Sequence, residues 1–119
     1  MRAARKTLIL VILVCGLAGL GPQAAQGAVA RSCNPVLNPY PGTRYADSAL
    51  RRIRALGVTC RGARRVARRA HYKALGLPVP PTGVRRFRWR DWRVTGDLRG
   101  DVDRYVAVRG GRSVRWVFS

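Results

Sequence analysis

The sequence predicts an α+β fold in which two N-terminal helices pack on one face of a three-stranded antiparallel β-meander. Apolar residues recur at helical spacing up to residue 76, and the period changes to two after residue 84. A Pro-rich connector separates the two halves, which is typical of helices and strands that segregate along the chain. With 119 residues there is room for one small domain, which we place at 47–119 after an irregular Pro-rich lead-in, 31–46.

The first thirty residues have the pattern of a cleaved Sec-type signal peptide. Basic residues near the start are followed by an apolar run over 8–20, which Gly21-Pro22 ends. Small residues then offer a cleavage site after Ala30, with cleavage after Gly27 as the alternative. A retained membrane anchor and lipidation at Cys15 are further alternatives. We expect a secreted, extracytoplasmic protein whose mature chain has no transmembrane segment.

Two cysteines, Cys33 and Cys60, remain after cleavage. Export favours their oxidation to a disulfide, which would stabilise a domain of this size by about 3.5 kcal/mol. Two free thiols or half of a metal site are the alternatives. The chain has one histidine and no second cysteine pair, so a tetrahedral zinc site cannot be assembled.

The first helix is expected to begin at Asp47 as N-cap and to end at Gly57. Between them, Leu50, Ile53 and Leu56 follow helical spacing.

The second helix is expected over about 60–75, between Thr59 as N-cap and Gly76 as terminator. One of its faces is mostly alanine, which allows close approach to a neighbour. The opposite face carries six cations: Arg61, Arg64, Arg65, Arg68, Arg69 and Lys73.

The β region is expected to begin with one strand over 84–94 that is bulged or kinked near Asp91, followed by a loop over 95–101. Strands over 102–108 and 113–118 then form a hairpin around a two-residue Gly-Gly turn. That turn predicts the register Arg109 with Arg112, Ala107 with Val114, and Tyr105 with Trp116.

Residues 53–67, IRALGVTCRGARRVA, resemble a pattern in small exported proteins of high-GC actinobacteria. That pattern is a helix, Gly-Val-Ser/Thr-Cys, then Ala-Arg opening a second helix, and a tryptophan-bearing β region. Residues 89–92 and 114–118 are similar to this β region, so the likeness spans about 47–119. The resemblance implies the fold and export, and it brings no catalytic residue. Relatives place further cysteines in the β region, and their absence here leaves Cys33 as the partner of Cys60.

The chemistry-bearing residues favour a protein that is not an enzyme. His71 is the only histidine and has no acidic residue nearby in the sequence, as nucleophilic catalysis would need. A carboxylate pair for glycoside hydrolysis could come only from Asp91, Asp97, Asp101 and Asp103. The spacing of the last three could also suggest calcium, but a turn neutralised by adjacent arginines explains it more simply. We expect no catalytic residue, no metal and no cofactor.

The charge points to anionic partners. The chain carries 24 Lys and Arg against 5 Asp and Glu, a net charge of +19, and all but two of the cations are arginines. Along the second helix the cations repel one another at i,i+4 spacing, and an anionic polymer would relieve that repulsion. The predicted function is an exported, non-enzymatic basic binding domain for envelope glycans, phosphate polymers, anionic lipid or extracellular nucleic acid.

Three alternatives stay open. The arginines could be a solvated face that reflects a high-GC genome. The domain could bind or inhibit an extracellular protein through its Pro-rich loops or its 95–101 loop. The aromatic residues Trp89, Trp92, Tyr105 and Trp116 are expected in the core, but they could instead stack on single-stranded nucleic acid.

Overall fold

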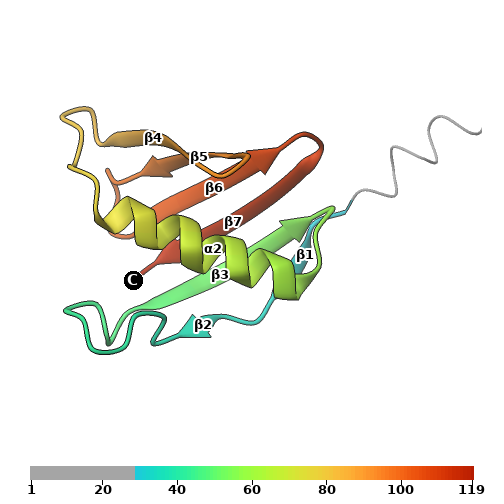
Figure 1. Cartoon of the computed structure of the whole chain (residues 1–119), viewed down its shortest axis with the longest axis horizontal. Helices are drawn as coiled ribbons and strands as arrows, with labels where there is room; N and C mark the ends of the chain where they lie inside the picture. The colour runs from blue at the N-terminus through green and yellow to red at the C-terminus, as the bar shows by residue number, and fades with distance from the viewer. Residues whose placement is uncertain (1–28) are drawn as a thin grey trace, which may run out of the picture.

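The computed structural model describes residues 29–119, so the predicted signal peptide lies outside it except for its last two residues. Within these residues, seven antiparallel strands form one sheet and a single helix packs against it (Figure 1). The elements in chain order are β1 (Arg31–Cys33), β2 (Val36–Leu37), β3 (Ala49–Leu56), α2 (Cys60–Leu75), β4 (Val84–Trp89), β5 (Trp92–Asp97), β6 (Asp103–Arg109) and β7 (Arg112–Phe118).

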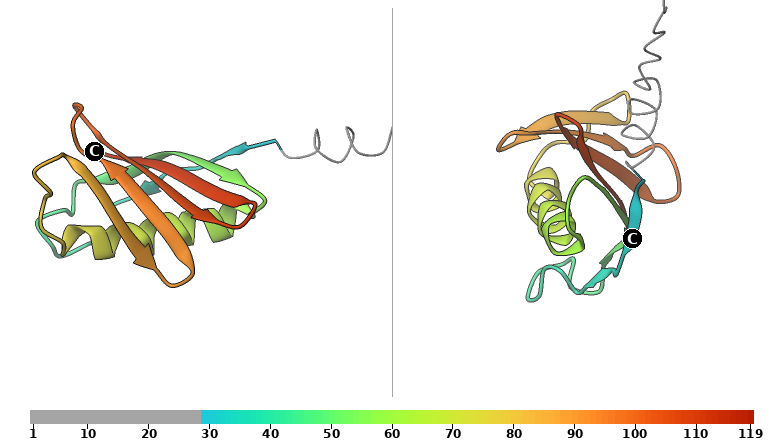
Figure 2. Two further views of the ribbon diagram at one scale, coloured as in Figure 1. Left: turned by 90° about the horizontal axis from the view of Figure 1, so that it is seen from above. Right: turned by 90° about the vertical axis from the view of Figure 1, so that its right-hand side faces the viewer.

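The strand order across the sheet is β1-β3-β7-β6-β5-β4, and β2 pairs with β3 beyond the end of β1. From β3 the chain crosses the sheet through α2 to the far edge at β4. The meander β4 to β7 then returns until β7 pairs with β3. Figure 2 shows α2 lying along one side of the twisted sheet. One face of the sheet is therefore covered by the helix, and we call the opposite one the outer face.

The predicted two-helix, three-stranded fold is wrong, and the first reason lies in β3. The segment expected to form the first helix is this strand, and Asp47 caps no helix. A β-bulge shifts the register between Arg51 and Arg54, where Arg52 has a φ of 51°. The extra residue places Leu50 and Ile53 on the same face although they are three positions apart. A bulged strand thereby imitates helical spacing.

The second reason lies in the region predicted as one kinked strand over 84–94. It is a hairpin, in which β4 and β5 are joined by the two-residue turn Arg90-Asp91 and Trp89 pairs with Trp92. Arg90 takes a φ of 52° in this turn, a conformation that more often selects glycine or asparagine. Because β5 continues to Asp97, it also includes the start of the predicted 95–101 loop. The meander has four strands instead of three.

Other expectations are confirmed. The second helix runs over Cys60–Leu75, and the Thr59 hydroxyl accepts a hydrogen bond from the Gly62 amide at 3.1 Å. Gly76 is its C-cap. The β6–β7 hairpin has the predicted register, including Tyr105 opposite Trp116.

The core lies between α2 and the inner face of the sheet. Four alanines of α2, from Ala63 to Ala74, are fully buried against it, because small side chains let the helix approach closely. The sheet contributes the largest apolar groups, with Trp116 1% exposed and Leu50 and Ile53 fully buried. The alanine face predicted from the sequence is thus the buried face of the helix.

The two ends of α2 are attached differently. At its first residue, Cys60 forms the predicted disulfide with Cys33 of β1, with 5.3 Å between the Cα atoms. At its last turn the attachment is the guanidinium of Arg85, which comes from β4 and is 6% exposed. It donates to the carbonyl oxygen of Ala74 at 2.7 Å, to those of Leu77 and Pro78, and to the Tyr105 hydroxyl at 3.2 Å.

Replacing Arg85 should destabilise the fold. In Arg85→Met the carbonyls at the end of α2 lose their donor while buried, and we expect the free energy of unfolding to fall by about 2–4 kcal/mol. Chemical denaturation would measure it. The matched control is Arg86→Met, because Arg86 is the exposed neighbour on the same strand and should change stability by less than about 0.5 kcal/mol. Equal effects of the two substitutions would contradict this role.

Candidate polyanion-binding surface

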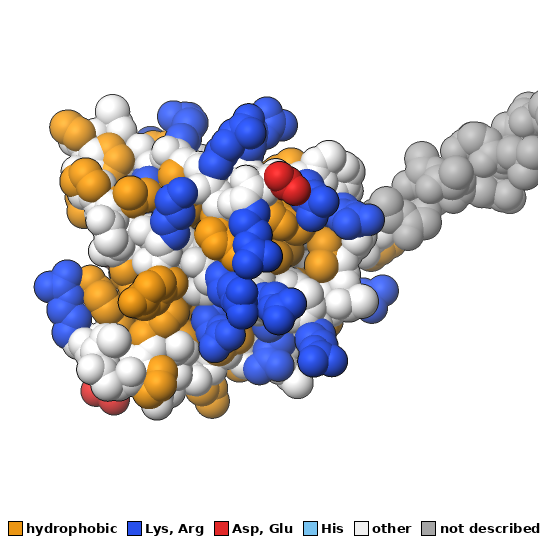
Figure 3. All heavy atoms as spheres, in the orientation of Figure 1, with side chains coloured by type: hydrophobic (Ala, Val, Ile, Leu, Met, Phe, Trp, Pro, Cys, Tyr) orange, Lys and Arg blue, Asp and Glu red, His pale blue; other side chains and the backbone are white. Residues whose placement is uncertain are grey.

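The outward side of α2 is a basic surface, which we call the α2 arginine face. Because the alanines of α2 occupy the side that packs on the sheet, the helical period directs the six cations predicted from the sequence to solvent. All six are exposed, and Figure 3 shows basic side chains gathered over the helix. The face consists of Arg61, Arg64, Arg65, Arg68, Arg69 and Lys73.

No carboxylate of the described chain lies within ion-pair distance of this face. Residues 29–119 contain two ion pairs, Arg99 with Asp97 and Arg109 with Asp91, and each joins the last residue of a strand to a residue of a loop or turn. Like charges at i,i+4 on a helix cost about 0.2–0.5 kcal/mol per pair at low salt. The α2 arginine face therefore keeps its positive potential and some of its repulsion.

Two members of the face contact backbone oxygens. Arg64 donates to the carbonyl of Pro35 at 3.3 Å, and the Lys73 ammonium donates to the carbonyl of Arg88 on β4. Neither contact neutralises the charge.

A groove of about 490 Å³ lies where the α2 arginine face meets the Pro-rich lead-in. It combines three cations with aromatic rings and prolines, and no acidic residue lines it. Its lining consists of Pro39, Tyr40, Pro41, Thr43, Arg68, Arg69, Tyr72, Trp89 and Arg90.

Aromatic contacts shape the groove. The rings of Tyr40 and Tyr72 are 5.5 Å apart and tilted, and the Arg90 guanidinium lies 5.1 Å from the centre of the Trp89 ring. The Tyr40 hydroxyl donates to the Arg68 carbonyl at 2.7 Å, and burial raises the pKa of this hydroxyl, so it remains a donor. Tyr72 is 63% exposed. The groove therefore offers an apolar ring surface beside cations.

Some of the residues predicted to bind a polyanion line this groove, and others lie outside it. Arg68 and Arg69 line it, whereas Arg61, Arg64 and Arg65 continue the basic surface toward the start of α2. Tyr40, Tyr72 and Arg90 also line the groove, and they are not among the residues predicted to bind a polyanion. The position of Tyr72, four residues after Arg68 on the helix, was a signal for its place beside the arginines.

The tryptophans differ in burial. Trp92 and Trp116 are 6% and 1% exposed, as the core prediction required. Trp89 is only partly buried and contributes to the groove.

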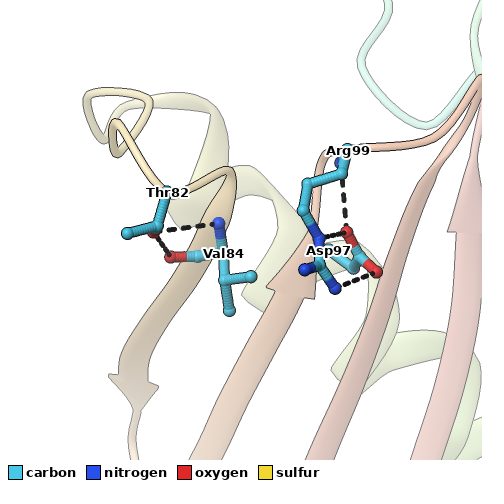
Figure 4. Close-up of polar contacts among 4 residues, drawn as sticks. All are labelled: Thr82, Val84, Asp97 and Arg99. Atoms are coloured by element: carbon cyan, nitrogen blue, oxygen red, sulfur yellow. Dashed lines mark hydrogen bonds and ion pairs between the residues drawn. The ribbon is translucent and has the colours of Figure 1, made fainter.

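Of the aspartates near residue 100, Asp97 ends β5, Asp101 lies in the loop that follows, and Asp103 begins β6. Both carboxylate oxygens of Asp97 accept from Arg99, with 3.0 Å between Oδ1 and Nε, and Oδ1 also accepts from the Arg99 amide (Figure 4). These hydrogen bonds lower the pKa of Asp97 to about 2. In the same figure, the Thr82 hydroxyl and the Val84 backbone form the neighbouring turn. Across residues 29–119, no three His, Cys, Asp or Glu side chains gather in a way that could hold a metal.

His71 belongs to the core. It is fully buried beside Tyr105 and Phe118, and its Nδ1 accepts from Trp116 Nε1 at 3.1 Å. Because the indole can only donate, the neutral ring carries its proton on Nε2, which has no hydrogen-bond partner in the described chain. Burial, assisted by the charge of Arg85, lowers the pKa of His71 to about 3.

Comparisons with family models, curated proteins and solved structures found nothing that matches this chain. The interpretation of the surface therefore depends on its own geometry. Over residues 29–119, no helix has both the length and the apolar character that crossing a membrane requires.

The buried His71 should make stability depend on pH. Its pKa is about 6.5 in the unfolded chain and about 3 in the folded one, so the unfolded chain binds the extra proton between these values. Stability should be complete above pH 6.5 and decrease by about 1.4 kcal/mol per unit as the pH falls toward 3. Urea denaturation at pH 7.5 and pH 5 should therefore differ by about 2 kcal/mol.

The control is His71→Gln. It removes the only histidine, so the difference between pH 7.5 and pH 5 should nearly vanish even if the variant is less stable. An unchanged pH dependence in this variant would refute the assignment.

Proposed function

We propose that this protein is an exported, non-enzymatic domain that binds anionic polymers through the α2 arginine face. The observation that carries the proposal is a row of six exposed cations on one helix with no carboxylate within ion-pair distance in the described chain. Arginine dominates the row, and its guanidinium matches the paired oxygens of phosphate and carboxylate groups.

The length of the row favours a polymer over a small anion. Arg61 and Lys73 are twelve positions apart, which corresponds to about 18 Å along a helix. A single phosphate or carboxylate could contact only one turn of that length. A chain with repeated anionic groups could engage the whole row and relieve the repulsion between its members.

The groove supports a preference within this class. Aromatic faces such as Tyr72 beside Arg68 and Arg69 suit a polymer that carries rings as well as charge, such as an acidic glycan or a single-stranded nucleic acid. A ringless polyphosphate would use the arginines alone.

Removing charge from the helix should weaken binding in a salt-dependent way. We expect the variant with glutamine at Arg61, Arg65, Arg68 and Arg69 to bind polyphosphate at least about tenfold more weakly at low salt. The slope of log affinity against log salt should also fall by about 3. Fluorescence anisotropy of labelled polyphosphate across a salt series would measure both quantities.

The control is a variant of equal net charge whose substitutions lie outside α2. This variant, which we call the loop variant, replaces with glutamine four exposed arginines that lie in loops or at strand ends: Arg44, Arg99, Arg109 and Arg112. This control should keep most of the affinity, because long-range attraction falls equally in both variants and only the helix variant loses local contacts. Equal losses, or no binding by the parent at low salt, would refute the proposal.

A protein partner is the second candidate, and the groove is the observation that favours it. Pro39 and Pro41 place the Pro-rich lead-in beside exposed aromatic surface, as in many peptide-binding grooves. Such binding should persist at physiological salt, whereas binding to a polyanion should decrease steeply.

Export gives a separate prediction. When the full chain is expressed in a bacterial host, the protein in the medium or periplasm should begin at Arg31, or at Ala28 if cleavage follows Gly27. Intact-mass measurement distinguishes these products. Replacing Ala28 and Ala30 with arginine should block cleavage after residue 30, because that site requires small residues, and should leave cleavage after Gly27 possible. A parent chain that stays in the cytoplasm and begins at Met1 would contradict export.

A further inference from the structure

The outer face of the sheet carries a second basic surface on the side away from α2. Strand alternation defines it, because residues next to inward-facing ones point outward. On β7, Val114 and Trp116 are buried under the helix, so Arg115 between them points outward. On β5, Trp92 and Val94 are buried, and Arg93 points outward.

The strand register brings arginines from five strands together on this face. Arg54 of β3 pairs with Arg115 of β7, and Arg88 of β4 pairs with Arg93 of β5. Every arginine at an outward position is exposed. We call this set the outer arginine face, and it consists of Arg51, Arg54, Arg86, Arg88, Arg93, Arg104 and Arg115.

These arginines are poorly compensated. Like charges directly opposite one another on neighbouring strands destabilise a sheet. The aspartate at an outward position in these rows, Asp97, is already bound by Arg99. Asp101 of the following loop lines a hollow with Arg51 and Arg104, but the ion pairs of the described chain do not include it. The face therefore combines repulsion with a positive potential, as the α2 arginine face does.

The face also contains a hollow that cations surround. A depression of about 470 Å³ lies over β4, β5 and β6, with Arg86, Arg88 and Arg93 around it and Thr95 and Val108 among its lining. No acidic residue lines it. Three guanidinium groups around one concave surface are suited to a group with several anionic oxygens.

We propose that the outer arginine face binds a second segment of anionic polymer, so that one protein molecule bridges two polymer molecules. The ligand chemistry follows from the proposed function, and the second site is the new element. The sheet separates the two faces, since Figure 2 shows α2 along its inner side and strand alternation directs the outer arginines to the other side. A polymer segment lying on α2 therefore leaves the outer face free for another.

Bridging has a consequence that a single site lacks. A protein with two opposed binding faces links long polymers into a network, and excess polymer disperses the network by occupying the faces separately. Mixing the full-length protein, as processed by the expressing cell, with long-chain polyphosphate at low salt should produce light scattering. The scattering should rise to a maximum and fall again as polymer is added.

Three variants of equal net charge test the second site. The first has glutamine at Arg61, Arg65, Arg68 and Arg69 of the helix. The second has glutamine at Arg54, Arg86, Arg88 and Arg93 of the outer face. The third is the loop variant with glutamine at Arg44, Arg99, Arg109 and Arg112.

We expect each single-face variant to bind polyphosphate in the anisotropy assay but to lose scattering by at least about tenfold, while the loop variant scatters like the parent. Circular dichroism melts would verify folding, since all substituted side chains are exposed. If the outer-face variant scatters like the parent, or if the parent binds without scattering, the second site is refuted and polyanion binding by α2 stands. If the parent does not bind, the proposed function fails as well.

Discussion

The buried guanidinium of Arg85 fixes the last turn of α2 to the sheet, and the position of the α2 arginine face depends on this contact. A buried cation is costly unless its donors are satisfied, and here carbonyl oxygens at the end of α2 and in the connector after it accept from both terminal nitrogens, whereas Nε has no partner in the described chain. The end of a helix carries partial negative charge, which favours a cation at this position. With Cys33–Cys60 at the other end, this contact sets which side of α2 faces the core and therefore which side presents its arginines.

The positions of the aspartates leave the positive charge of α2 and of the strand middles uncompensated. All five aspartates lie in loops or at the ends of strands, and two of them form the ion pairs with Arg99 and Arg109. The middles of the strands and the whole of α2 carry no acid. Repulsion on the helix amounts to about 1–2 kcal/mol. A disulfide typically contributes about 2–4 kcal/mol, so the cross-link alone can offset it.

The sequence was informative where local rules decide the structure. The helix after Thr59 and the hairpin at Gly110 follow from capping and turn chemistry, which involve only neighbouring residues. The sequence was misleading where a non-glycine residue with positive φ interrupts the alternation of a strand. Arg52 in the bulge gives β3 the apolar spacing of a helix. Arg90 forms a turn without the usual glycine, so one predicted strand is two. The α2 arginine face could be predicted because one helix contains it. The groove and the outer arginine face could not, because they join residues that only the sheet brings together.

The two arginine faces result from one constraint. A single-layer sheet covered by one helix has two surfaces in contact with solvent, the outer side of the sheet and the outward side of the helix. Amphipathic patterning directs polar residues to both, and here nearly every such residue is arginine. A genome rich in arginine codons would also place arginines on these surfaces, but it would give no preference for guanidinium groups around a concave hollow over those in loops. The comparison of the face variants with the loop variant separates these explanations, because the three differ only in where four positive charges are removed.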